Sequence, residues 1–270
     1  MEVNIIKEIE EKLACSLSAE TTELLPFLPY LLQDFWELGS DPEVMCGLIQ
    51  KHVDLSPETR VLDLACGKGA ISVKIAERLQ AKVKGIDILP EFIEYAVRKA
   101  SEYNATDLCE FIIGDINEAI DHEKDYDIVI FGAAGIVLGN PAEMLRKLKS
   151  VIKPGGYILI DEGYLPDNVK QSDVKCNSYE LLTEKQWATL FREAELELVD
   201  TVFDENNNTP ASGDRETGMG FITARADELI EMHPDKKAIF EGYVLNQQNE
   251  YDDIDNTLIC ATWILKKHGL

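Results

Sequence analysis

The chain has 270 residues, 45% of them hydrophobic, which is enough for one large domain with a substantial core. It carries 50 acidic and 26 basic residues, and its formal net charge is −24. So acidic a surface repels phosphate backbones and anionic lipids, and we therefore expect neither nucleic acid nor a membrane as a partner.

The placement of charges and cysteines predicts a cytoplasmic protein. Glu2, Lys7 and Glu8 interrupt the apolar residues near the start, and no run is long enough to span a bilayer. The six cysteines show neither zinc-ligand spacing nor a pattern typical of a disulfide framework, so we expect no metal site. The sequence makes no prediction of the oligomeric state.

Residues 1–56 are predicted to form an N-terminal helical cap. An amphipathic helix precedes an aromatic-rich stretch that holds Phe27, Tyr30, Phe35 and Trp36. We expect this cap to lie over a ligand cleft and to shield it from water. Packing of the helix on a sheet edge would explain the same aromatic residues.

Residues 57–204 alternate between short β-rich runs and amphipathic helical segments. Strands are predicted at 60–65, 82–87, 109–115, 126–133, 157–162 and 196–204, and helices at 71–80, 89–104, 141–152 and 183–195. Nearly continuous apolar strands that alternate with helices predict an α/β fold, with a mostly parallel sheet covered by helices on both faces. We expect one domain over residues 1–270, in which an insert (205–255) separates this core from a last strand within 256–270.

Small and acidic residues follow the predicted strands. The turn "ACGKG" contains Ala65, Gly67 and Gly69, and Asp87, Asp115 and Gly132 end the next three strands. Because the carboxyl ends of parallel strands meet at one edge, we expect these residues to line one ligand site.

The acids in this set favour a nucleoside with a zwitterionic tail. Asp87 is placed to accept hydrogen bonds from ribose hydroxyls, and Asp115 from an exocyclic amine of a base. Asp63 just before the turn, and Ser72 where a dinucleotide fold has its third glycine, disfavour a pyrophosphate. A ligand with an ammonium group beside Asp63 and a carboxylate at the N-terminus of the following helix would match the charge at each place. S-adenosylmethionine has both groups in its amino-acid tail, so these residues point to it.

The motifs "VLDLACGKG", "GID", "GDI", "YDIVIFGAAG" and "IKPGGYILIDE" together resemble those of class I S-adenosylmethionine-dependent methyltransferases. The resemblance covers roughly residues 57–162. It implies a Rossmann-like fold with seven strands, the last of them antiparallel. It further implies S-adenosylmethionine as the cofactor, with these roles by position: Asp63, Ala65, Gly67 and Gly69 at the methionyl end, Asp87 and Ile88 at the ribose, Asp115 and Ile116 at the adenine, and Gly132 under the sulfonium.

The first position of the turn departs from the family, which usually has glycine where this chain has Ala65. Alanine is tolerated there if its φ is negative, so the departure bears on the local backbone more than on the cofactor. Lys68 is expected to face solvent. Asp63 and Asp115 have an alternative role as helix caps.

Acceptor-side catalytic residues are predicted at the end of the fifth strand, where Asp161, Glu162 and Tyr164 lie. The alternative is a strand end that is merely solvated. The polar loop at residues 205–220 is predicted to contribute to acceptor specificity.

The predicted function is methyl transfer to a small-molecule acceptor by in-line displacement. A protein methyltransferase is an alternative, as is an S-adenosylmethionine-binding protein without catalysis. An NAD-dependent oxidoreductase shares the fold and the ribose acid, but Ser72 and Asp115 argue against it.

Overall fold

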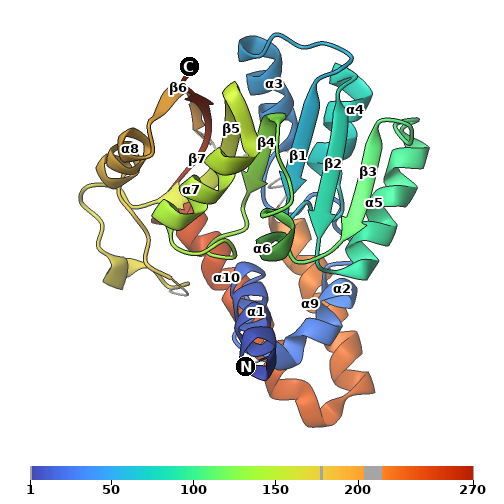
Figure 1. The fold of residues 1–270 in the computed structure, drawn as a ribbon. Coiled ribbons are helices and arrows are strands. Elements are labelled where there is room, and N and C mark those ends of the chain that lie inside the picture. Colours follow the sequence, from blue (N-terminus) through green and yellow to red (C-terminus); the bar gives the residue numbers. More distant parts are fainter. Residues whose placement is uncertain (1, 177–178, 204–214, 270) are drawn as a thin grey trace.

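Within residues 2–176, 179–203 and 215–269, which the computed structural model describes, seven strands form one sheet in the order β3-β2-β1-β4-β5-β7-β6 (Figure 1). The strands are β1 (Arg60–Leu64), β2 (Lys82–Asp87), β3 (Cys109–Ile113), β4 (Tyr126–Gly132), β5 (Ile152–Tyr164), β6 (Leu196–Phe203) and β7 (Ile259–Lys267). The pairs among β1 to β5 are parallel, and β7 is antiparallel to β5 and β6. The predicted fold, with its antiparallel last strand, is confirmed.

Alternate residues of the central strands pack against helices on opposite faces of the sheet. Val61, Ile128 and Ile130 belong to one buried cluster, whereas Leu62 and Val129 belong to the other. The first cluster includes residues of α3 (Pro42–His52), α4 (Ala70–Leu79) and α5 (Pro90–Glu102); the second includes residues of α6 (Ile116–Ala119), α7 (Pro141–Val151) and α8 (Glu184–Glu193). Both faces of the central strands are therefore buried under helices, which explains why these strands are almost continuously apolar.

Local signals in the sequence set several helix ends. Asn140 and Glu143 form a capping box before α7, and Thr183 and Gln186 form one before α8. Proline follows the N-cap of α3, α5 and α7, where its missing N–H has no partner to lose.

The N-terminal segment and the insert pack together at the carboxyl ends of the parallel strands (Figure 1). The N-terminal part comprises α1 (Glu2–Ser16), a 3₁₀ turn (Thr22–Phe27) and α2 (Leu28–Leu31), and the insert comprises α9 (Arg215–Met232), a 3₁₀ turn (Pro234–Lys236) and α10 (Lys237–Asn256). Leu28, Ile222 and Phe240 belong to their shared apolar cluster. The two segments thus form one helical layer below the sheet.

Residues 204–214 lie outside the described part of the chain, and they include most of the predicted acceptor loop. A further 3₁₀ turn (Gln171–Asp173) lies between β5 and α8. No helix among the described residues is long and apolar enough to cross a membrane.

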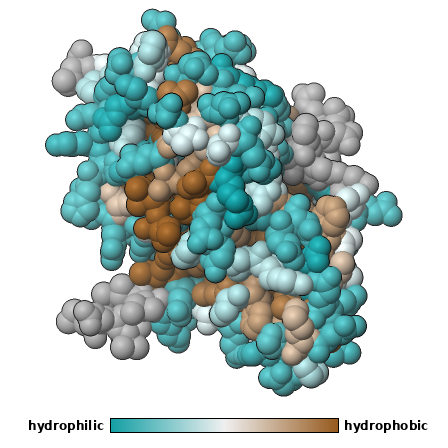
Figure 2. Space-filling view, turned by 90° about the vertical axis from the view of Figure 1, so that its right-hand side faces the viewer, coloured by the Kyte–Doolittle hydropathy of each residue, from teal (hydrophilic) through white to brown (hydrophobic). Residues whose placement is uncertain are grey.

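An apolar patch lies on the side of the molecule that carries the β3 edge (Figure 2). On β3 and on the neighbouring helix α5, the exposed apolar side chains are Ile112, Ile113 and Val97. Since β3 is the edge strand of the sheet, it has a neighbouring strand on one side only.

Candidate functional site

The turn after β1 folds through left-handed backbone conformations. Ala65, Gly67 and Gly69 have φ angles of 57°, 53° and 73°. A Cβ added at Gly69 would lie 2.7 Å from the Cβ of Ala96, so α5 also requires glycine there. The φ at Ala65 is positive, so the condition that favours alanine is not met: the chain turns there as it would with glycine, at a cost of about 1–2 kcal/mol.

Asp87 ends β2 beside this turn and is buried. Its carboxylate accepts hydrogen bonds from the backbone N–H of Gly67 at 2.8 Å and of Leu89 at 2.9 Å. Burial raises the pKa of this carboxyl, and the backbone hydrogen bonds oppose the rise. One acid therefore fixes the turn and still lines the cleft described below.

Asp63 lies near the end of β1 and accepts a hydrogen bond from the Ser72 hydroxyl at 2.5 Å. Burial raises the pKa of Asp63 to about 7, the Ser72 hydrogen bond opposes this, and nearby Asp87 adds to it. Ser72, which replaces the third glycine of a dinucleotide motif, thus serves as the partner of Asp63. The N-cap position of α4 belongs to Gly69 and not to Asp63, although Asp63 also interacts with the backbone N–H of Ser72 in the first turn of this helix.

Asp115 and Gly132 occupy the ends of the neighbouring strands. Asp115 is the N-cap of α6 and accepts from the Asn117 backbone N–H at 2.8 Å, so the capping alternative holds for this residue. At Gly132 a Cβ would lie 2.4 Å from the Ser40 Oγ, which explains the need for glycine. That Oγ is buried and has no hydrogen-bond partner within the described residues.

A cleft of about 930 Å³, partly open to solvent, joins these residues at the carboxyl ends of the strands. Of the predicted cofactor residues, the cleft is lined by Asp63, Ala65, Gly67, Asp87, Ile88, Asp115, Ile116 and Gly132, whereas Gly69 is not in its lining. Ile9 and Leu13 of α1 line the same cleft. The structure therefore brings the predicted cofactor residues other than Gly69 to one cleft, and α1 contributes to its wall.

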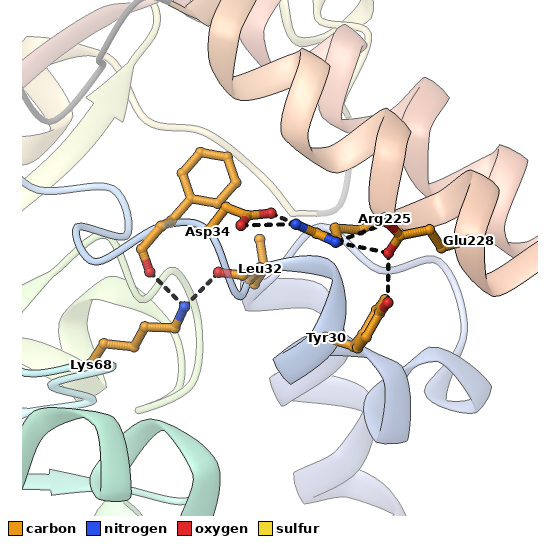
Figure 3. Close-up of polar contacts among 7 residues, drawn as sticks. Tyr30, Leu32, Asp34, Lys68, Arg225 and Glu228 are labelled. Carbon is orange, nitrogen blue, oxygen red and sulfur yellow. Dashed lines mark hydrogen bonds and ion pairs between the residues drawn. The ribbon is translucent and has the colours of Figure 1, made fainter. Parts of the chain in front are cut away.

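Lys68 is buried, which corrects the expectation that it faces solvent. Its Nζ donates to the carbonyls of Leu32 and Phe35, both at 2.5 Å (Figure 3). The same Nζ lies 5.0 Å from the centre of the Tyr95 ring. Burial lowers the pKa of Lys68 to about 8. Lys68 is buried because of a tertiary contact. The segment after α2 crosses the turn, and two of its backbone carbonyls need a hydrogen-bond donor, which Lys68 supplies.

The same segment is tied to α9 by a polar network (Figure 3). Arg225 donates to both carboxylate oxygens of Asp34, at 2.7 and 3.1 Å. It also pairs with Glu228, which accepts a hydrogen bond from the Tyr30 hydroxyl at 2.5 Å. The glycine turn, the cap and the insert are thus joined through residues 30–36.

The predicted acceptor-side residues separate into two groups. Asp161 and Glu162 line a second cavity, and Asp161 accepts a hydrogen bond from the Thr262 hydroxyl at 2.8 Å. Tyr164 instead lies in the core, 3% exposed, stacked 6.1 Å from the Trp263 ring and absent from the lining of both cavities. Its catalytic assignment is contradicted, because β5 continues to Tyr164 and α8 covers this part of the strand.

The second cavity encloses about 2560 Å³, open solvent included, and adjoins the first. Ser16, Leu17, Trp36, Leu38 and Ala133 line both. Residues of the cap, β5, β7, α9 and α10 contribute to its walls. Across the described part of the chain, no group of three or more His, Cys, Asp or Glu side chains is arranged to hold a metal ion.

Many lining residues of these cavities were not predicted, among them Ser40 in the first and Tyr179 and Glu250 in the second. Tyr179 donates to Glu162 at 3.0 Å, and Glu250 accepts from the Ser18 hydroxyl at 2.5 Å. None of these three lies in a motif, and Glu250 is one of many charges in a polar segment. Only tertiary packing brings them to the site.

Comparisons with known proteins agree with this fold. A family model described as "Methyltransferase domain" matches residues 55–197, which is more than half of the chain. The chain is 31% identical over 118 residues to a probable cobalt-precorrin-6B C(15)-methyltransferase (decarboxylating) of Methanothermobacter thermautotrophicus, covering 44% of this chain and 59% of the relative. It is 23% identical over 208 residues to phosphoethanolamine N-methyltransferase 1 of Triticum aestivum, covering 76% of this chain and 38% of the relative.

Solved structures share the architecture over most of the chain. A SAM-dependent methyltransferase from Thiobacillus denitrificans, solved in complex with S-adenosyl-L-homocysteine, has a TM-score of 0.71 at 18% sequence identity. The alignment covers 88% of this chain and 97% of that one. At this identity the likeness shows the fold, and the family match extends over β1 to β5 and into β6. The chain therefore belongs to the methyltransferase-domain family.

Proposed function

We propose that this protein transfers a methyl group from S-adenosylmethionine to a small-molecule acceptor by in-line displacement. The observation that carries the proposal is the first cleft, which gathers Asp63, Asp87, Asp115 and the glycine turn at the carboxyl ends of parallel strands. The methyltransferase activities for which the two relatives described above are named support methyl transfer, although the chain spans only 59% and 38% of their lengths.

The residues of the cleft fit S-adenosylmethionine. Asp63 and Asp87 are buried carboxylates whose pKa values burial raises, and neither pairs with a lysine or arginine among the described residues. A ligand that brings an ammonium group and ribose hydroxyls would satisfy both. The Ser40 Oγ is an orphaned buried polar atom beside Gly132, so a bound ligand with a polar group there would give it a partner.

Each part of the cleft has a role in binding. Asp87 would accept from the ribose hydroxyls, Ile88 and Ile116 would flank the adenine, and Asp115 would accept from its amine. Asp63 and the backbone N–H groups at the start of α4 would hold the amino-acid tail. When bound, S-adenosylmethionine supplies a methyl group on a sulfonium, which is already activated for transfer.

The protein's further contribution is orientation and the exclusion of water. The second cavity adjoins the first along Trp36, Leu38 and Ala133, which gives an acceptor a place next to the cofactor. Ser16 at the end of α1 lines both cavities, and residues of α9 and α10 line the second. Holding two reactants in line and out of water accounts for much of the acceleration in reactions of this kind.

The test is calorimetric titration with S-adenosyl-L-homocysteine. We expect the wild-type protein to bind it, and Asp87→Asn to bind it at least about tenfold more weakly, since a charge-assisted hydrogen bond contributes about 1.5–3 kcal/mol. NADH at the same concentrations should not bind. Unchanged affinity in Asp87→Asn would exclude the ribose assignment, and binding of NADH alone would favour a dehydrogenase.

A further inference from the structure

We propose that the second cavity binds an organic amine, held as an ammonium ion by Glu162 and Glu250 among aromatic side chains. This inference rests on the methyl transfer proposed above and names the class of acceptor. Three features of the cavity support it: its charge, the partners of each carboxylate, and the chemistry of its walls.

The charge of the cavity is strongly negative. Its described lining includes seven carboxylates and one guanidinium, that of Arg215, which contacts Asp255. The carboxylates belong to Asp34, Glu37, Asp41, Asp161, Glu162, Glu250 and Asp253. A cleft lined by one sign of charge concentrates ligands of the opposite sign and repels ligands of its own sign. A cation is therefore favoured over a carboxylate or phosphate acceptor.

Several of these acids already have partners that explain them structurally. Asp34 pairs with Arg225, and Asp161 accepts from Thr262. Asp253 accepts from the backbone N–H groups of Lys175 and Cys176, at 2.8 and 2.7 Å, and so anchors that segment. These three carboxylates are occupied by contacts within the protein.

The hydrogen-bond donors of Glu162 and Glu250 are likewise neutral, in contrast to the arginine that pairs with Asp34. Glu162 accepts from the Tyr179 hydroxyl at 3.0 Å and from its neighbouring backbone N–H at 3.1 Å. Glu250 accepts from Ser18 and from the Gln247 amide at 3.0 Å. Neither forms an ion pair with a lysine, arginine or histidine of the described residues, whereas Glu228 on α9 does with Arg225.

Burial without a cationic partner disfavours the ionised form of both carboxyl groups, which raises their pKa values. Burial raises the pKa of Glu162 to about 7, and nearby Asp161 and Glu250 add to the rise, while the Tyr179 hydrogen bond opposes it. Burial also raises the pKa of Glu250. A cation placed between these carboxylates would offset the unfavourable burial and restore their ionised forms.

The walls of the cavity favour an organic cation over a metal ion. Aromatic side chains line it on several sides: Phe35, Trp36, Tyr179, Phe221, Tyr243 and Tyr251. Ring faces attract an ammonium group and also pack against its hydrocarbon part. Divalent ions, in contrast, prefer a shell of oxygen ligands, which rings do not supply.

The same residues suit the chemistry of nitrogen methylation. An ammonium must lose a proton before its nitrogen can act as a nucleophile, and a Glu162 carboxylate oxygen is placed to accept that proton. The freed lone pair then forms the new N–C bond, and the electron pair of the breaking C–S bond stays on sulfur. The methylated ammonium carries the positive charge that the sulfonium loses, so charge is conserved.

The inference is tested by sorting possible acceptors by charge. A cellular metabolite extract is separated at pH 7 into cationic, neutral and anionic pools by ion exchange. Each pool is incubated with the full-length protein and methyl-labelled S-adenosylmethionine, and labelled small molecules are counted. We expect label in the cationic pool, at least tenfold above the other two.

The outcomes separate this inference from the function on which it rests. Label only in the neutral or anionic pool would overturn the amine assignment and leave methyl transfer standing. Label in no pool, from a protein that binds S-adenosyl-L-homocysteine, would overturn the proposed transfer and this inference with it.

Substitutions then test the two carboxylates with the labelled acceptor. Glu162→Gln and Glu250→Gln should each lower kcat/KM at least tenfold while leaving S-adenosyl-L-homocysteine affinity within twofold. Glu110→Gln, an exposed change on β3 outside both cavities, removes the same charge and should change neither quantity. Unchanged kcat/KM in both cavity variants would contradict the inference.

The pH dependence of kcat/KM distinguishes a Glu162 that accepts a proton from one that only shapes the cavity. The groups that face Glu162 are Tyr179, Asp161 and Glu250. In the wild type we expect kcat/KM to rise with pH as Glu162 loses its proton, and in Glu162→Gln this limb should be absent. An identical profile in the two proteins would show that Glu162 accepts no proton.

Discussion

Ala65 adopts a left-handed conformation, with φ at 57°, that suits glycine better than alanine. We expect Ala65→Gly to raise the free energy of unfolding by up to about 1 kcal/mol, because relief of backbone strain exceeds the added chain entropy of glycine. Ala188→Gly is the matched control: Ala188 is exposed in the ordinary helical backbone of α8, and this change should lower stability by about 1 kcal/mol. Urea unfolding measures both, and equal losses in the two variants would contradict the assigned backbone.

The buried carboxyl of Asp63 makes stability depend on pH. Burial raises the pKa of Asp63 from its ordinary value of 3.8 to about 7, so the folded state holds the proton more tightly than the unfolded chain. The stabilisation is therefore complete below about pH 4 and is lost as pH rises through about 7, by at most about 1.4 kcal/mol per pH unit. The difference in unfolding free energy between wild type and Asp63→Asn should fall over this window. A difference that stays constant would show that Asp63 titrates normally.

The residues that could be predicted from sequence are those that follow strands. Asp63, Asp87 and Asp115 sit beside local strand signals, and parallel strands bring their ends together without further information. The burial of Lys68 and the position of Glu250 depend on contacts between distant segments, which no local pattern carries. Tyr164 was misplaced for a related reason, since its strand runs further than its apolar pattern indicates.

At the scale of elements, Lys68 connects the glycine turn with the segment that follows α2. Lys68→Met should lower the free energy of unfolding by about 1–3 kcal/mol, because the carbonyls of Leu32 and Phe35 lose a buried donor. Lys237→Met, on the exposed face of α10, should change it by less than about 0.5 kcal/mol. Hydrogen exchange should show faster opening around residues 32–36 in Lys68→Met alone. Equal exchange in the two variants would contradict the anchoring role.

The arrangement of the helical layer follows from the same contacts. Asp34, Arg225, Glu228 and Tyr30 tie the cap to α9, while α1 lines the first cleft and α10 lines the second. The N-terminal segment and the insert before β7 thus meet at the carboxyl ends of the parallel strands. For this reason the cap and the insert form one apolar cluster in the structure, although the sequence presents them as separate additions to the core.

At the scale of the whole molecule, the formal charge of −24 opposes binding to nucleic acid. Nonspecific binding requires basic side chains that displace counterions from phosphates, and its strength falls steeply with salt. Among the charged side chains described in the lining of the cavity next to the proposed cofactor cleft, seven are carboxylates and one is a guanidinium, so the repulsion extends to the place where a base would have to enter. We expect no gel shift with bulk tRNA or duplex DNA at 150 mM salt and micromolar protein, and at most a weak one at 50 mM. A salt-sensitive micromolar complex would show that a local basic surface overrides the net charge, and it would reopen nucleic acid as the methyl acceptor.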